Sequence, residues 1–190
     1  MIIYQITRPL SYLKIEHKEK WKFDWLMPVI MTVFTSSIIL ILRNQLNIFG
    51  VDGLISQIIS LVQILPGFYI AALAAISTFN KNDIDQLMPE PTPKVEILIR
   101  GQRNTIDLTR RRFLCMLFAF LVSESIAISL LGIFSLKFAK AIKLFLNPLL
   151  QPFASHFLTF CFFLLFWQLI ISTMLGLYYL GDKMHQPNLE

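Results

Sequence analysis

One carboxylate stands alone inside a long apolar run. The run from Phe113 to Leu136 contains a single charged residue, Glu124. A charged and unpaired carboxylate at the centre of a bilayer costs at least about 2.5–3.5 kcal/mol on insertion scales. Glu124 is therefore expected to be protonated, paired or in contact with water. Gln168 lies at a similar depth in the last apolar run and is the expected partner, within one chain or between two.

Two interpretations of Glu124 remain open. The carboxyl group either belongs to an ion or proton path, or it is a protonated residue that packs and hydrogen-bonds between helices. No second charge lies in the apolar runs to relay a proton, which favours the packing role.

The sequence has no motif typical of catalysis, of metal binding or of a cofactor. It contains no HExxH, CxxC or GxSxG pattern and no phosphate-binding glycine loop. The three histidines, at positions 17, 156 and 185, are scattered and show no metal-ligand spacing. We expect neither an enzyme nor a metal or cofactor site.

Small residues repeat every four positions in two of the apolar runs. One stripe is Gly67, Ala71 and Ala75, and the other is Ala119, Ser123 and Ala127. Such stripes let membrane helices approach closely, because lipid provides no hydrophobic drive between them. The two stripes are expected either to pack against each other within one chain or to meet another copy.

These residues must be positioned by membrane-spanning helices. The chain of 190 residues is 55% hydrophobic and 15% charged, whereas soluble domains carry roughly 25% charged residues. The sequence therefore predicts an all-α integral membrane protein with a small cytoplasmic β-hairpin loop. The predicted transmembrane helices are 25–42, 54–79, 113–136 and 156–180. The remaining parts are an N-terminal segment (1–24), a middle loop (80–112) and a tail (181–190).

The distribution of basic residues predicts the orientation. Thirteen lysines and arginines fall in the N-terminal segment, the middle loop and the tail, against four on the other side. The positive-inside rule then places both termini and the middle loop in the cytoplasm of a bacterial inner membrane. This orientation explains the net charge of +5 better than direct nucleic-acid binding does.

Three local patterns refine the prediction. Pro66 and Gly67 predict a hinge within the second span. In the middle loop, VEILIR and TIDLT around positions 101–104 favour a hairpin that packs on the bundle, on another copy or on a partner, although an extended connector remains open. The segment 137–155 fits either a short interfacial helix that ends at its Asn-Pro and Gln-Pro steps or an ordinary amphipathic connector.

A stretch of about fifty residues supports a family resemblance. It runs from AALAAISTF through LMPEPTP to LTRRRFL. This stretch and the four-span layout resemble the membrane subunit of the Kiwa anti-phage defence system. The resemblance implies an oligomeric sensor that acts with a cytoplasmic partner, and the partner would carry the activity directed at nucleic acid. It also implies that the middle loop and the termini form the partner-binding face. The arginines expected on that face are Arg100, Arg103, Arg110, Arg111 and Arg112.

The functional expectation is an oligomeric inner-membrane sensor or scaffold. Its expected partners are membrane lipid, other copies of the chain and a cytoplasmic protein. One alternative is a small channel or transporter gated around Glu124 and the Pro66 hinge. The other is a pore-forming effector.

Overall fold

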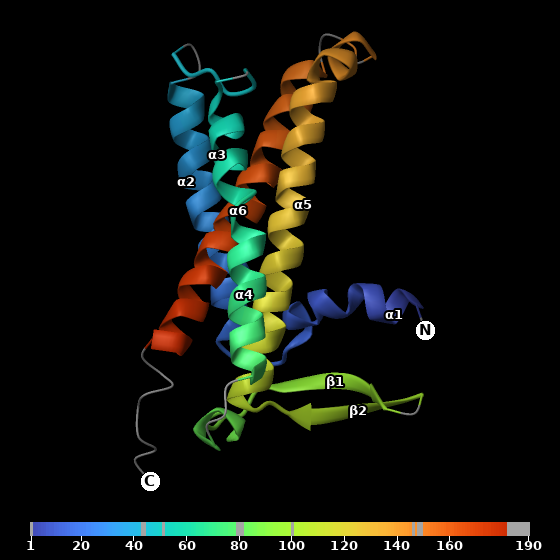
Figure 1. Cartoon of the computed structure of the whole chain (residues 1–190). Helices are drawn as coiled ribbons and strands as arrows, with labels where there is room; N and C mark the ends of the chain where they lie inside the picture. The colour runs from blue at the N-terminus through green and yellow to red at the C-terminus, as the bar shows by residue number, and fades with distance from the viewer. Residues whose placement is uncertain are drawn as a thin grey trace.

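The computed structural model describes residues 2–42, 45–50, 52–78, 82–99, 101–145, 147 and 150–181. Helices dominate, and one small antiparallel sheet, which follows the second long apolar stretch in the sequence, lies at one end of the bundle (Figure 1). The helical elements are α1 (Ile2–Thr7), the 3₁₀ helix η1 (Arg8–Lys14), the π-helical turn η2 (Lys22–Leu26), α2 (Met27–Ile41), α3 (Leu54–Val62), α4 (Leu65–Thr78), the 3₁₀ turn η3 (Asn82–Asp85), α5 (Arg110–Phe145) and α6 (Gln151–Gly181). The strands are β1 (Lys94–Ile99) and β2 (Gln102–Asp107).

Four helical stretches are long and apolar enough to cross a membrane, as the sequence predicts. They are Lys22–Ile41, Leu54–Thr78, Arg110–Phe138 and Gln151–Gly181. They stand side by side, and the N-terminal segment, the sheet and the end of α6 lie toward the same end of the bundle (Figure 1). We call this end the hairpin end. Large apolar side chains such as Phe34, Ile41 and Phe68 face outward, as expected for helices that contact lipid.

A break divides the second span. α3 ends at Val62 and α4 begins at Leu65, with Pro66 in its first turn. Proline is tolerated there because the first N–H groups of a helix have no partner within it. The predicted hinge thus lies at the junction of two helices.

The third span is longer than predicted. α5 continues for 36 residues to Phe145, so the first half of the segment 137–155 extends this helix and is not a separate interfacial helix. α6 begins at Gln151, five residues before the predicted start of span four. Pro152 therefore occupies the first turn of α6, where we had expected it to end a helix.

The predicted β-hairpin is confirmed. Its register pairs Lys94 with Asp107 and Ile99 with Gln102, which leaves a two-residue connection. Gly101 has a φ of +82°, and glycine adopts positive φ without a steric penalty. The turn is therefore centred earlier than the predicted positions 101–104, and residues 102–104 belong to β2.

The N-terminal segment joins the hairpin to the bundle. Glu16 forms an isolated antiparallel bridge with Lys94, with N–O distances of 2.9 and 3.2 Å. Just before Glu16 in the same segment, Tyr12 and Ile15 are buried in the core around α5. The N-terminal segment, residues 1–24, was predicted as a separate cytoplasmic part. Its described residues instead contact both the hairpin and the core around α5.

Candidate functional site

The most unusual feature of the bundle is a group of polar side chains buried where the N-terminal segment meets α5 and α6. Each member is less than 9% exposed. We call it the buried polar cluster, and its members are Tyr12, Lys20, Asp24, Glu124 and Gln168. Buried polar groups are costly unless they are paired, so the partner of each one decides what the cluster can do.

Tyr12 connects the N-terminal segment to α5 and to the first span. Its ring stacks on Phe120 with a centroid distance of 5.1 Å and tilts against Phe113 at 6.1 Å. Its hydroxyl group donates a hydrogen bond of 3.2 Å to Oδ1 of Asp24. Burial, the Asp24 carboxylate and, more weakly, Glu124 raise the pKa of Tyr12 above its ordinary value, so the phenol keeps its proton.

Lys20 and Asp24 form a buried ion pair. The two residues are one helical turn apart, and Lys20 Nζ donates to Oδ2 of Asp24. The ammonium group also lies 4.0 Å from the centroid of the Tyr12 ring, in a cation–π arrangement. Burial lowers the pKa of Lys20, and the Asp24 carboxylate opposes that shift.

Gln168 bonds to the backbone of the first span. Its Nε2 donates a hydrogen bond of 3.0 Å to the carbonyl oxygen of Asp24. In an α-helix that carbonyl would accept from the residue four positions later, which here is Pro28 and has no N–H. Gln168 therefore supplies a side-chain donor to this carbonyl, at the π-helical turn where the first span begins.

Glu124 is the exception in the cluster. Both of its carboxyl oxygens are buried and have no hydrogen-bond partner among the described residues. The predicted hydrogen bond to Gln168 is not formed within the chain, and the Nε2 group of Gln168 donates to the carbonyl oxygen of Asp24 instead. The flanking serines also bond elsewhere: Ser123 donates to Ala119 and Ser125 to Val122, on their own helix.

Glu124 lies midway along its own apolar stretch, as the fifteenth of the 29 residues of Arg110–Phe138. The carboxyl group lies close enough to Asp24 for the two acids to interact electrostatically. Asp24 is the third residue of the first apolar stretch. The third stretch therefore begins further toward the hairpin end than the first stretch does.

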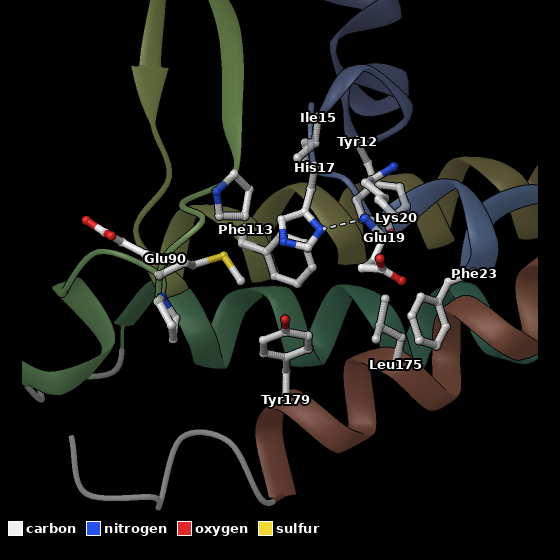
Figure 2. A pocket seen from close by; sticks show the side chains of 13 residues that line it. Tyr12, Ile15, His17, Glu19, Lys20, Phe23, Glu90, Phe113, Leu175 and Tyr179 are labelled. Carbon is white, nitrogen blue, oxygen red and sulfur yellow. Dashed lines mark hydrogen bonds between the residues drawn. The ribbon is translucent and has the colours of Figure 1, made fainter. Parts of the chain in front are cut away.

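A pocket of about 230 Å³ adjoins the cluster at the hairpin end (Figure 2). His17, Phe113 and Tyr179 point into it from the N-terminal segment, α5 and α6. Tyr12 and Lys20 also line it, so it opens directly onto the cluster. His17 accepts a hydrogen bond of 3.3 Å from the backbone N–H of Glu19 through its Nδ1.

The site carries no arrangement typical of metal chemistry. Over the part of the chain that the structure describes, no three His, Cys, Asp or Glu side chains form a group that could hold a metal ion. The pairing of Lys20 with Asp24 and the stacking of Tyr12 instead fit a structural joint between segments.

The structure separates the five arginines that were expected on the partner-binding face. Arg100 lies outside the described residues, whereas Arg103 and Arg112 are exposed. Arg103 lies 3.9 Å from a carboxylate oxygen of Glu96 across the hairpin. Arg110 is buried at the start of α5 and does not face outward.

Arg111 holds the middle loop to the bundle. It forms a bidentate ion pair with Asp85, at 2.6 and 2.8 Å, and donates to the carbonyl oxygens of Ile76 and Ser77 at the end of α4. The Arg111 guanidinium group lowers the pKa of Asp85. The expectation of a partner-facing side chain is therefore corrected for Arg110 and for Arg111, which are engaged within the chain.

The stripe on the second span faces away from the bundle. Gly67, Ala71 and Ala75 are exposed, and a Cβ atom added at Gly67 would meet no atom within 4 Å. On α5, Ala119 and Ser123 are partly buried and Ala127 is exposed. The two stripes therefore do not form a common close-packed face within one chain.

Two glycines that we had not singled out lie at close helix contacts. A Cβ atom at Gly132 would collide with Ile59 of α3 and lie 3.1 Å from Phe162 of α6. A Cβ atom at Gly176 would lie 3.3 Å from Leu117 of α5. A single glycine within an apolar run was the sequence signal for such a contact. Only the fold shows which side chain packs against each glycine.

The chain matches no protein-family model, no curated protein and no solved structure.

Proposed function

We propose that this chain is a multi-pass protein of a bacterial inner membrane, with its hairpin end in the cytoplasm. Four apolar helices of sufficient length support the spanning part of this proposal. The excess of basic residues in the segments at the hairpin end, thirteen against four, supports the orientation.

Within that membrane, the chain acts as an oligomeric sensor or scaffold that transmits changes in helix packing to a cytoplasmic partner. The observation that carries this proposal is the double attachment of the N-terminal segment. Tyr12 packs on α5 and bonds to the first span, while Glu16 pairs with β1 only four residues later. A four-residue separation leaves little slack between the two attachments, so the segment is a short mechanical link.

The link has a defined direction of action. A tilt or rotation of α5 relative to the first span would change the positions of Phe120 and Asp24, the two groups that hold Tyr12. Tyr12 would then move Glu16, and Glu16 would move β1. Buried contacts of this kind switch between discrete arrangements, because close-packed interiors do not deform continuously.

Self-association uses the outward stripe on α4. Gly67, Ala71 and Ala75 form a small-residue face that the single chain leaves exposed. In lipid, such a face gains from close contact with another helix. This arrangement supports a homo-oligomer in which α4 helices from neighbouring copies meet.

The partner-binding face is the hairpin with the start of α5. Over the described residues, β2 pairs only with β1, which leaves its other edge open to added strands or loops. The exposed Arg103 and Arg112 provide positive charge beside it. A role in anti-phage defence is part of the proposal and rests on the resemblance of the stretch from α4 to the start of α5.

Reporter fusions test the orientation. Fusions after Asn80 and after Leu180 should report the cytoplasm, and a fusion near Phe145 should report the outside. A cytoplasmic signal at Phe145 would contradict the four-span arrangement.

Affinity purification in mild detergent tests the partner. The products of neighbouring genes should copurify with the wild-type chain and be lost from the variant R103E/R112E. The matched control is Lys137→Glu, which changes an exposed charge at the other end of α5. If R103E/R112E recovers as much of the partner as the wild-type chain does, the hairpin end is not the partner-binding face.

A second candidate function is ion or proton conduction, and the unpartnered Glu124 favours it. A buried carboxyl group without a partner is a position where a proton or cation could reside. Reconstituted protein should then conduct, and Glu124→Gln should abolish the current. Absence of current from the wild-type chain would contradict conduction and favour the sensor or scaffold.

A further inference from the structure

The first thirteen described residues form an arm that leaves the bundle sideways. This N-terminal arm consists of α1 and η1 and runs beside the hairpin (Figure 1). One of its faces is attached to β1. The Tyr4 hydroxyl accepts a hydrogen bond of 3.2 Å from the N–H of Leu98, and Arg8 donates one of 3.4 Å to the carbonyl of Glu96.

The opposite face of the arm is apolar, and none of the residues that the structure describes covers it. Ile2 and Ile6 stand two positions away from Tyr4 on either side, which places them on the far side of the helix from the hairpin. They are 71% and 72% exposed. Leu10 and Leu13 continue the face through η1, at the three-residue spacing of a 3₁₀ helix.

The position of the arm identifies what would cover this face. Trp21 and Trp25 are exposed at the start of the first apolar stretch, where aromatic side chains mark a membrane–water interface. The arm joins the bundle just before these tryptophans. Lys14 ends the arm and Lys18 follows it, so both place positive charge shortly before these tryptophans in the sequence, where it attracts an anionic leaflet.

We propose that the N-terminal arm lies in the lipid headgroup layer on the hairpin side, with Ile2, Ile6 and Leu10 among the acyl chains and with Lys14 and Lys18 on anionic headgroups. The hairpin lies on the aqueous side of the arm, because β1 is attached to the face that bears Tyr4 and Arg8. This inference rests on the proposed placement of the four helices across a membrane. It makes the arm a second point of contact with lipid, connected to the hairpin independently of the spans.

Fluorescence quenching in vesicles tests the proposal. The full chain, with Cys115 and Cys161 replaced by serine, carries one introduced cysteine labelled with an environment-sensitive dye. The test position is Ile6→Cys, the control in a span is Phe34→Cys, and the control on the hairpin is Thr105→Cys. The vesicles contain phosphatidylcholine and phosphatidylglycerol, with bromine on the acyl chains of a fraction of the lipids.

We expect the brominated lipids to quench the labels at positions 6 and 34 but not at position 105. Quenching at position 6 should weaken when phosphatidylglycerol is omitted, while quenching at position 34 should not change. Quenching at position 34 without quenching at position 6 would overturn the placement of the arm and leave the spans standing. Oxidative cross-linking through position 6 in that case would assign the face to a second copy. Absence of quenching at position 34 would overturn the membrane placement itself, and this inference with it.

Discussion

The hydroxyl group of Tyr12 donates a hydrogen bond of 3.2 Å to Oδ1 of Asp24, while the Tyr12 ring stacks on Phe120 of α5. One side chain thus joins the segment before the spans to the first span and to the third. Lys20 completes the arrangement by pairing with the same carboxylate from the other side.

The Lys20–Asp24 ion pair should be sensitive to the loss of one partner and tolerant of the loss of both. Lys20→Met leaves a buried and unpaired carboxylate, which should cost about 3–5 kcal/mol of stability. The double variant K20M/D24L removes both charges and should recover most of that loss. Thermal unfolding in mild detergent measures both variants, and a double variant as unstable as the single one would show that the charges themselves are required.

Glu124 and Gln168 should respond in opposite ways to leucine. Glu124→Leu replaces a buried group that has no partner, so stability should stay equal or rise. This outcome differs from what a bond between the two side chains, as expected from the sequence, would produce. Gln168→Leu removes the donor to the Asp24 carbonyl and should cost about 1 kcal/mol. A loss on Glu124→Leu would reveal a partner supplied by another copy or by a bound ligand.

The attachment of the middle loop should be lost in acid. The Arg111 guanidinium group lowers the pKa of Asp85 below its ordinary value of 3.8. The contribution of this ion pair is therefore complete above pH 3.8 and is lost as the pH falls through the lower, folded-state pKa. The protection of residues 84–93, taken relative to intrinsic exchange at each pH, should fall below that pH, and Asp85→Asn should show lower protection already at pH 7. Unchanged exchange in Asp85→Asn would mean that other contacts hold the loop.

The outward stripe on α4 should control assembly without affecting the fold of the single chain. Gly67→Leu places a side chain in open space and should reduce the assembly size in mild detergent. Gly132→Leu is the matched control, because it collides with Ile59 and should unfold or loosen the bundle. An unchanged assembly size in Gly67→Leu, with a stable fold, would show that this face meets only lipid.

The sequence was sufficient for the features that depend on local pattern. A helix that crosses lipid needs a long apolar run, and the hydropathy of the sequence was enough to locate the four apolar helices. Alternation and the glycine at position 101 predicted the hairpin, and Pro66 predicted the break between α3 and α4. The boundaries of α5 and α6 were less predictable, because a helix can continue into water beyond its apolar part.

The buried polar cluster was only partly visible in the sequence. Lys20 and Asp24 stand one helical turn apart, which was an available signal, but nothing local indicates that the pair is buried. The partner of Gln168 depends on the missing N–H of Pro28 and on where α6 crosses the first span. The stripe at Gly67 showed a face suited to close packing, and its spacing could not show that the face points away from the bundle.

The central claim is that the N-terminal segment transmits helix packing to the hairpin, and hydrogen exchange of β1 and β2 in Tyr12→Ala tests it most directly. Truncation of this buried ring should cost about 3–5 kcal/mol by analogy with other aromatic truncations, so exchange is compared under conditions where α5 and α6 remain protected. We predict faster exchange across Lys94–Asp107, because the Glu16 bridge loses its anchor. Lys137→Ala, at the other end of α5, should leave that exchange unchanged. Wild-type protection of the hairpin in Tyr12→Ala, with the helices intact, would contradict the account.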